Sequence, residues 1–125
     1  MRRAIQSDFA PQAIGPYSQA YQVGNLLFTS GQIPLTADGK LIDGDIVDQT
    51  HQVFRNLQAV LESGGSALND VIKVTLFVKN LHDFSRINEV YASYFTNNLP
   101  ARSCIEVSRL PKDVEVEIEV IAYIN

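Results

Sequence analysis

The chain has 125 residues, of which 46% are hydrophobic and 19% are charged, as in an ordinary globular domain, and this excludes a disordered or fibrous protein. Lysine and arginine number 10 against 14 aspartates and glutamates, and the net charge of −4 argues against a protein that grips the phosphate backbone of nucleic acid. The single cysteine has no partner for an internal disulfide, and no apolar N-terminal segment resembles a signal peptide or a membrane span. We therefore expect one cytoplasmic domain covering residues 1–125, without membrane contact.

A β-hairpin is predicted in the first quarter of the chain. A Gly-Pro dipeptide forces a turn just before Tyr17. Residues 18–23 and 26–32 then have strand character, and the Gly-Asn pair between them is typical of a two-residue hairpin connection. The second strand ends near Ser30 and Gly31, where a glycine lets a ligand or another backbone approach closely. Both are candidate site residues, although a plain β-bulge explains the glycine equally well.

The clearest helix follows a surface loop at residues 35–44, which contains two Asp-Gly turn dipeptides. Asp45 is a suitable N-cap, and a Gly-Gly pair at 64–65 ends the helix. Its apolar residues recur at helical spacing and are Ile46, Val53, Phe54, Leu57, Val60 and Leu61. His51 belongs to this helix, is expected to be solvated, and has no partner at metal-ligand spacing, so we assign it no role.

The middle of the chain predicts a strand and a second helix. Residues 71–79 alternate with the period of a strand whose core face would hold Ile72, Val74, Leu76 and Val78. A second helix is expected from about Asp83 to Phe95, because apolar residues form a stripe there and a proline follows at position 100. Asn88 lies beside that stripe.

The stretch from Pro100 to Pro111 contains the most unusual chemistry of the chain. Its residues alternate, so that Arg102 and Cys104 share one face of a predicted strand. An arginine at the start of a strand can hold a planar carboxylate by two parallel hydrogen bonds. The alternative is an ion pair between Arg102 and a carboxylate of the next strand, and pattern alone favours this commoner arrangement.

The last predicted strand, residues 114–125, has an apolar face and a face that carries Glu115, Glu117 and Glu119. Three carboxylates in a row repel one another unless solvent or cations neutralise them, so a solvated face is the simplest interpretation. A one-residue change in the preceding turn decides whether Arg102 lies on the same side as this row. The sequence leaves that question open.

The expected order is strand, strand, strand, helix, strand, helix, strand, strand. This order indicates a mixed α+β domain of two packed layers, with both helices on one face of the sheet. The opposite face would expose apolar side chains, including Phe77, Ile121 and Tyr123, so we expect other subunits to cover it in a closed homo-oligomer.

Several kinds of chemistry are missing from the sequence. It has no Cys or His cluster at metal spacing, no Gly-rich phosphate loop and no dinucleotide fingerprint, so we expect neither a metal nor a cofactor. A catalytic pair between Cys104 and His51 or His82 is disfavoured, because both histidines are predicted on or beside helices of the opposite layer.

The segments 13–18, 29–34, 87–95 and 100–111 closely resemble the Rid family, the reactive intermediate deaminases formerly called endoribonuclease or translation inhibitor L-PSP. Pro-Ala-Arg-Ser-Cys-Ile-Glu-Val followed by Leu-Pro-Lys-Asp is a specific signature, and its arginine is typical of the RidA subfamily. The resemblance implies a chorismate-mutase-like fold and a homotrimer with three clefts between subunits. It also implies a cofactor-free 2-iminobutanoate/2-iminopropanoate deaminase, which converts imine or enamine carboxylates such as 2-aminoacrylate to 2-oxo acids and ammonia.

Carried onto this chain, the resemblance makes Arg102 the clamp on the substrate carboxylate and Glu117 the residue that places water. A nearby arginine would also keep Glu117 ionised, because it favours the charged form. The remaining residues that the resemblance places in the cleft are Tyr17, Ser30, Gly31, Asn88 and the backbone at Cys104.

Two other functions remain open at this point. The same clamp would suit a regulatory protein that binds a stable 2-oxo acid or amino acid. An endoribonuclease ranks last, because the chain is acidic and offers no plausible pair of histidines for acid–base catalysis.

Overall fold

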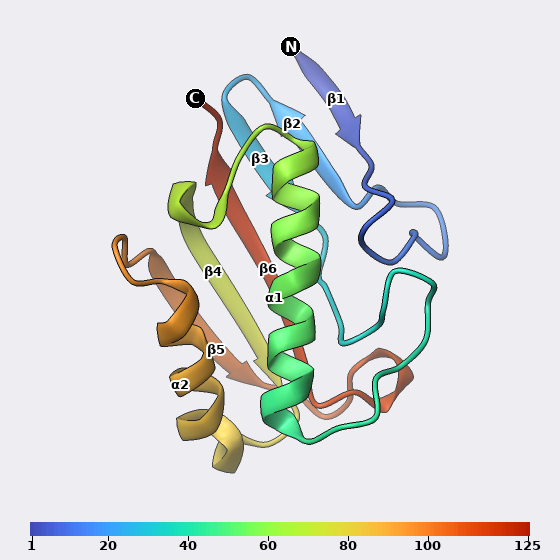
Figure 1. The fold of residues 1–125 in the computed structure, drawn as a ribbon, viewed down its shortest axis with the longest axis vertical. Coiled ribbons are helices and arrows are strands. Elements are labelled where there is room, and N and C mark those ends of the chain that lie inside the picture. Colours follow the sequence, from blue (N-terminus) through green and yellow to red (C-terminus); the bar gives the residue numbers. More distant parts are fainter.

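A computed structural model describes residues 1–125, and Figure 1 shows a twisted sheet with two long helices in front of it. The sheet has six strands in the order β1-β2-β3-β6-β4-β5, and every neighbouring pair is antiparallel except β4 and β5. The strands are β1 (Arg2–Ile5), β2 (Ala20–Val23), β3 (Leu26–Thr29), β4 (Val71–Val78), β5 (Ala101–Glu106) and β6 (Val116–Tyr123); the helices are α1 (Ile46–Ser63) and α2 (Phe84–Tyr94). The predicted α+β class, with both helices on one face, is confirmed.

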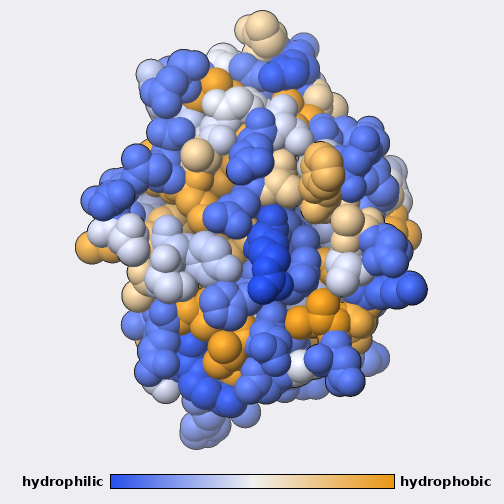
Figure 2. Space-filling model, viewed as in Figure 1, coloured by the Kyte–Doolittle hydropathy of each residue, from blue (hydrophilic) through white to orange (hydrophobic).

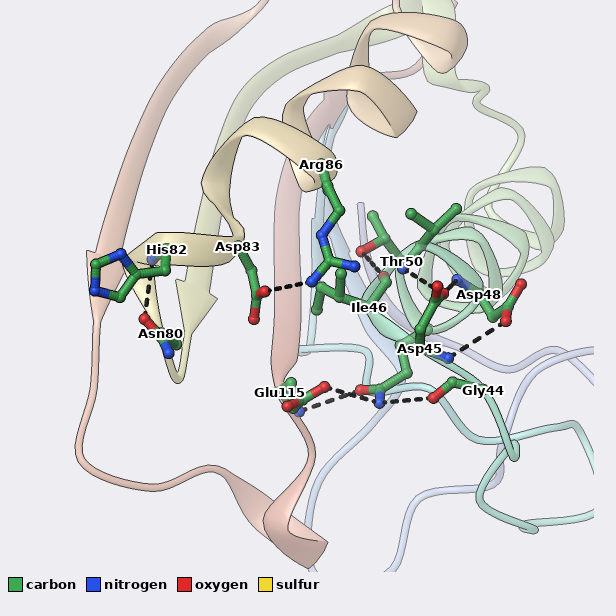
Figure 3. A network of polar contacts seen from close by, with 12 residues as sticks. Gly44, Asp45, Ile46, Asp48, Thr50, Asn80, His82, Asp83, Arg86 and Glu115 are labelled. Carbon is green, nitrogen blue, oxygen red and sulfur yellow. Dashed lines mark hydrogen bonds and ion pairs between the residues drawn. The ribbon is translucent and has the colours of Figure 1, made fainter.

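Helix α1 begins and ends where the sequence predicts. The Asp45 side chain accepts hydrogen bonds from the backbone N–H groups of Val47 and Asp48, and the Asp48 carboxylate accepts from the Asp45 N–H, which completes a capping box (Figure 3). At the other end, the Gly64 N–H donates to the carbonyls of the last turn. The predicted apolar stripe is buried against the sheet.

Helix α2 packs beside α1 through an aromatic cluster. Phe54 of α1 stacks on Tyr94 with ring centroids 4.4 Å apart, and it meets Tyr91 and Phe95 edge-on. His51 is half-buried and its Nδ1 lies 2.9 Å from the Tyr94 Oη, so the expectation of a solvated histidine is wrong. The hydrogen bond and the ring contact tie the two helices together.

Strand β4 departs from the predicted alternation at its first residues. The register with β6 shifts between Val71 and Lys73, as at a β-bulge, and the shift turns Ile72 outward, where it is 47% exposed. Val71 takes its place in the core, followed by Val74, Leu76 and Val78. The prediction of Ile72 on the core face is therefore wrong, because an extra residue reverses the alternation.

The sheet face away from the helices carries a band of apolar side chains. Cross-strand pairs join Tyr21 to Phe28 and Phe28 to Ile121, and Tyr123 lies next to this row. Phe28 is 40% and Tyr123 42% exposed, while Ile121 and Phe77 are half-buried. The helical side, by contrast, is mostly hydrophilic (Figure 2). Neither helix is both long enough and apolar enough to cross a membrane.

Candidate functional site

The loop after β3 brings Gly31 against a carboxylate of β6. Beyond Thr29, the backbone of Gln32 pairs with Ile118, with N···O distances of 2.9 and 3.1 Å in the two directions. This pairing carries Gly31 alongside Glu117. A methyl group on Gly31 would lie 2.7 Å from the Glu117 Cδ and would overlap one carboxylate oxygen. Glycine is therefore needed here for close approach and not for an unusual backbone angle.

A pocket of about 430 Å³ opens at this point and contains four of the predicted site residues. They are Tyr17, Ser30, Gly31 and Glu117. The Ser30 N–H donates to the Gln19 carbonyl at 2.8 Å and its hydroxyl donates to the Ser18 carbonyl at 2.6 Å, so the serine oxygen remains free to accept. Tyr17 is 54% exposed at the rim of the pocket.

The electrostatics of Glu117 differ from the expectation. Burial raises the pKa of Glu117 above its ordinary value, and the neighbouring Glu119 raises this pKa further. All three ion pairs of the chain involve other residues and lie at the surface. Within one chain no arginine lowers the pKa of Glu117, because Arg102 lies on the other face of the sheet.

The register of β5 settles on which face Arg102 lies. In the parallel pairing with β4, Arg102 is opposite Val74 and Cys104 is opposite Leu76, both of which face the helices. The glutamates of β6 face the other way. The proposed ion pair between Arg102 and a carboxylate of the last strand is therefore wrong within this chain, and Arg102 forms no ion pair at all.

Arg102 instead contacts helix α2. Its Nη1 donates to the Asn88 Oδ1 at 2.6 Å. Its guanidinium carbon lies 4.7 Å from the ring centroid of Tyr91 and 5.2 Å from that of Phe84. A second pocket of about 470 Å³ opens beside it. Apart from Asn88 and Arg102, the residues that line it are apolar or aromatic: Tyr91, Ala92, Phe95, Leu99 and Pro100.

Cys104 is half-buried next to the core, and its thiol has no hydrogen-bond partner. Burial raises the pKa of its thiol, and the nearby Arg102 charge opposes this shift only in part. The thiol therefore stays protonated at neutral pH. No group of three or more His, Cys, Asp or Glu side chains is placed to hold a metal ion.

The structure thus divides the predicted site residues into two half-sites. The Glu117 half-site comprises Tyr17, Ser30, Gly31 and Glu117; the Arg102 half-site comprises Asn88, Arg102 and Cys104. They lie on opposite faces of the same sheet, so one chain alone does not bring the guanidinium to the carboxylate.

Sequence reasoning missed three residues next to these half-sites. Phe84 lies four positions before Asn88 and Tyr91 three positions after it. This spacing places all three on one side of a helix and could have identified them. Lys112 lines the Glu117 pocket with a positive φ of 56°, which a Lys-Asp turn does not predict.

The chain is thus a small two-layer α+β protein in which the predicted site residues form two groups on opposite faces of one sheet. Residues 7–124 match the family model described as Endoribonuclease L-PSP, and the chain belongs to this family. A RutC family protein of Pyrococcus horikoshii is 56% identical, with 98% of each chain covered. The 2-iminobutanoate/2-iminopropanoate deaminase of Escherichia coli is 45% identical, again over 98% of each.

Solved structures agree with this assignment. The Rid family protein YyfA from Yersinia pestis has a TM-score of 0.96 and 46% identity, covering 99% of this chain and 100% of that one. The E. coli protein TdcF, solved with bound serine, has a TM-score of 0.94 and 43% identity, covering 98% of this chain and 99% of that one.

Proposed function

We propose that this protein is a cytoplasmic deaminase that hydrolyses 2-aminoacrylate, 2-iminopropanoate and related 2-imino acids to 2-oxo acids and ammonia. The observation that carries the proposal is the exposed guanidinium of Arg102, which lies near two aromatic rings and forms no ion pair, and which is therefore a ready partner for a carboxylate. The 45% identity to the E. coli imine deaminase supports the same reaction.

The proposed active unit is a homotrimer with a cleft at each of its three subunit interfaces. Two observations support it: the half-sites lie on opposite faces of one sheet, and the face that carries Glu117 also exposes an apolar band. A second copy that covers this band would bring its own Arg102 half-site towards Glu117, and closed rotational symmetry would repeat the cleft. Light scattering tests the assembly, and a monomer at micromolar concentration would contradict it.

The reaction needs little machinery. Arg102 holds the substrate carboxylate, which fixes the imine carbon in the cleft. Water adds to this carbon while Glu117 accepts one proton from the water and passes it to the imine nitrogen, which becomes an amine. In the resulting carbinolamine, Glu117 takes the hydroxyl proton and passes it to the nitrogen, so that the C–N bond breaks and the 2-oxo acid and ammonia are released. Burial raises the pKa of Glu117 within one chain, and the guanidinium that a second copy would bring opposes this shift, so that Glu117 stays ionised and able to accept a proton.

A coupled assay tests the activity. A dehydratase that acts on serine generates 2-aminoacrylate, and its disappearance is followed with and without this protein. We expect faster loss of the intermediate with the wild-type protein and a rate close to the spontaneous one with Arg102→Ala. An unchanged rate with wild-type protein would refute the deaminase proposal.

The second candidate function is binding without turnover. The structure of TdcF with bound serine favours it, since that similar protein holds a small amino acid. Calorimetric binding of serine or a 2-oxo acid, combined with no hydrolysis of a freshly generated imine, would support a regulatory role instead.

A further inference from the structure

We propose that Phe84, Asn88 and Tyr91 form a clamp that positions Arg102, and that Asn88 acts on the substrate through Arg102 and not by direct contact. This inference deepens the proposed function, because it concerns how the carboxylate-binding arginine is held. All three residues come from α2, on the side of the helix that faces β5.

The contacts restrain the guanidinium in different directions. Both ring centroids lie within the range of about 6 Å in which a cation is attracted to an aromatic face. The amide oxygen of Asn88, 2.6 Å from Nη1, fixes the rotation of the guanidinium within its own plane. Without these partners, Arg102 would be a long exposed side chain on an edge strand, free to sample many rotamers. The clamp orders it before the ligand arrives.

The geometry also leaves the required donors free. Asn88 accepts from one nitrogen, Nη1, and the two rings, which are not hydrogen-bond acceptors of this kind, lie near the guanidinium carbon. The other N–H groups, at the edge of the plane, remain unpaired within the chain and suit a planar carboxylate. The neutral amide of Asn88 keeps both the charge and the free donors of Arg102 available to the substrate. An aspartate at position 88 would neutralise the arginine and occupy its donors.

Tyr91 contributes its ring and not its hydroxyl. The Tyr91 Oη is buried and has no hydrogen-bond partner, and the residue is only 7% exposed. An unsatisfied buried hydroxyl does not stabilise the fold, so its removal in Tyr91→Phe should leave the clamp intact. The melting temperature of this variant is expected to match or exceed that of the wild type.

The test measures binding of 2-oxobutanoate, a stable carboxylate product, to the purified protein by calorimetry. Loss of one ring in Phe84→Leu should raise the Kd by about two- to fivefold, whereas Phe84→Tyr should restore binding to the wild-type value. Asn88→Asp should weaken binding more than Asn88→Ala, with no loss of thermal stability.

Tyr94→Leu is the matched control. Tyr94 lies on the same helix and stacks on Phe54, but it does not contact Arg102. This variant should lower the melting temperature and leave the Kd unchanged. If Tyr94→Leu weakened binding as much as Phe84→Leu, general loosening of α2 would explain both effects and the clamp would be refuted.

A double-mutant cycle separates positioning from direct contact. Binding is measured at ligand concentrations high enough to determine the weakened Kd of Arg102→Ala. In this background, the added change Asn88→Ala or Phe84→Leu should not raise the Kd further. A further loss would mean that these side chains touch the ligand themselves, which overturns the inference. Turnover is assayed separately. Binding through Arg102 without hydrolysis would refute the deaminase proposal but not the clamp. Hydrolysis that is insensitive to Phe84→Leu would refute the clamp alone.

Discussion

A single methyl group at Gly31 should impair catalysis without unfolding the protein. In Gly31→Ala, the new Cβ would lie 2.7 Å from the Glu117 Cδ, where ordinary contacts begin at 3.4 Å. The backbone of Gly31 is outside the left-handed region, so alanine fits the chain itself. The strain therefore acts on the carboxyl group, which is the flexible end of its side chain and can move.

The size of the effect follows from the displacement. The Glu117 carboxyl must move by at least about 0.7 Å, because its Cδ is that far short of ordinary contact and one of its oxygens is closer still, and misplacement of a catalytic group by about 1 Å can reduce a rate about a hundredfold. We expect kcat/KM for 2-iminobutanoate to fall by about ten- to a hundredfold in Gly31→Ala. The free energy of unfolding should change by less than about 1 kcal/mol.

Gly39→Ala is the control for this experiment. Gly39 has a φ of 85° in a surface loop with nothing within 4 Å, so alanine there should lower stability by about 1 kcal/mol or more and leave kcat/KM unchanged. Wild-type kcat/KM in Gly31→Ala would refute the reasoning, because the overlap with Glu117 would then have no catalytic consequence. A rate loss that persists when Glu117→Ala is already present would instead assign Gly31 a role of its own.

Three further predictions concern the two half-sites. Arg102→Ala should reduce kcat/KM by about ten- to a hundredfold. Arg102→Lys should recover little of this loss, because a point charge cannot replace the planar fork of the guanidinium. Normal turnover by a destabilised variant would refute the catalytic role of Arg102. Because burial raises the pKa of Glu117 in the folded chain, its ionisation favours unfolding where no arginine opposes the shift. In the Arg102→Ala background, Glu117→Gln should therefore raise the melting temperature near pH 8, and this gain should vanish below pH 4.5, the ordinary pKa of the group. A gain that persists unchanged at low pH would contradict the linkage. Finally, Cys104→Ser should retain imine hydrolysis, since burial keeps the thiol protonated and no base is bonded to it; loss of activity in a folded variant would show otherwise.

Local signals in the sequence were sufficient for most of the fold. Asp45 and the glycine pair at 64–65 delimit α1 because a side-chain cap and a glycine act within one helical turn. The alternation along 114–125 predicts the core face of β6 because successive side chains must point to opposite sides. The resemblance drawn from the arginine motif predicted the family correctly, since the model of that family matches residues 7–124.

Some errors arose where an interaction across the sheet overrides a local pattern. The bulge at Val71 and Lys73 depends on pairing with β6, and it moves Ile72 out of the core. The half-buried position of His51 depends on Tyr94, a residue more than 40 positions away in the chain. Periodicity within one element contains neither kind of information.

The sequence alone was enough to nominate Arg102 and Gly31 from their residue types and positions, and the resemblance to a known family added Glu117. Only the tertiary structure decided that Arg102 faces α2 while Glu117 faces the apolar band, since a parallel partner strand sets the register of β5 and one residue of register reverses a face. Likewise, only packing between elements brought Gly31 against Glu117 and placed two rings beside Arg102. These are contacts between distant segments, and their geometry depends on how the layers pack.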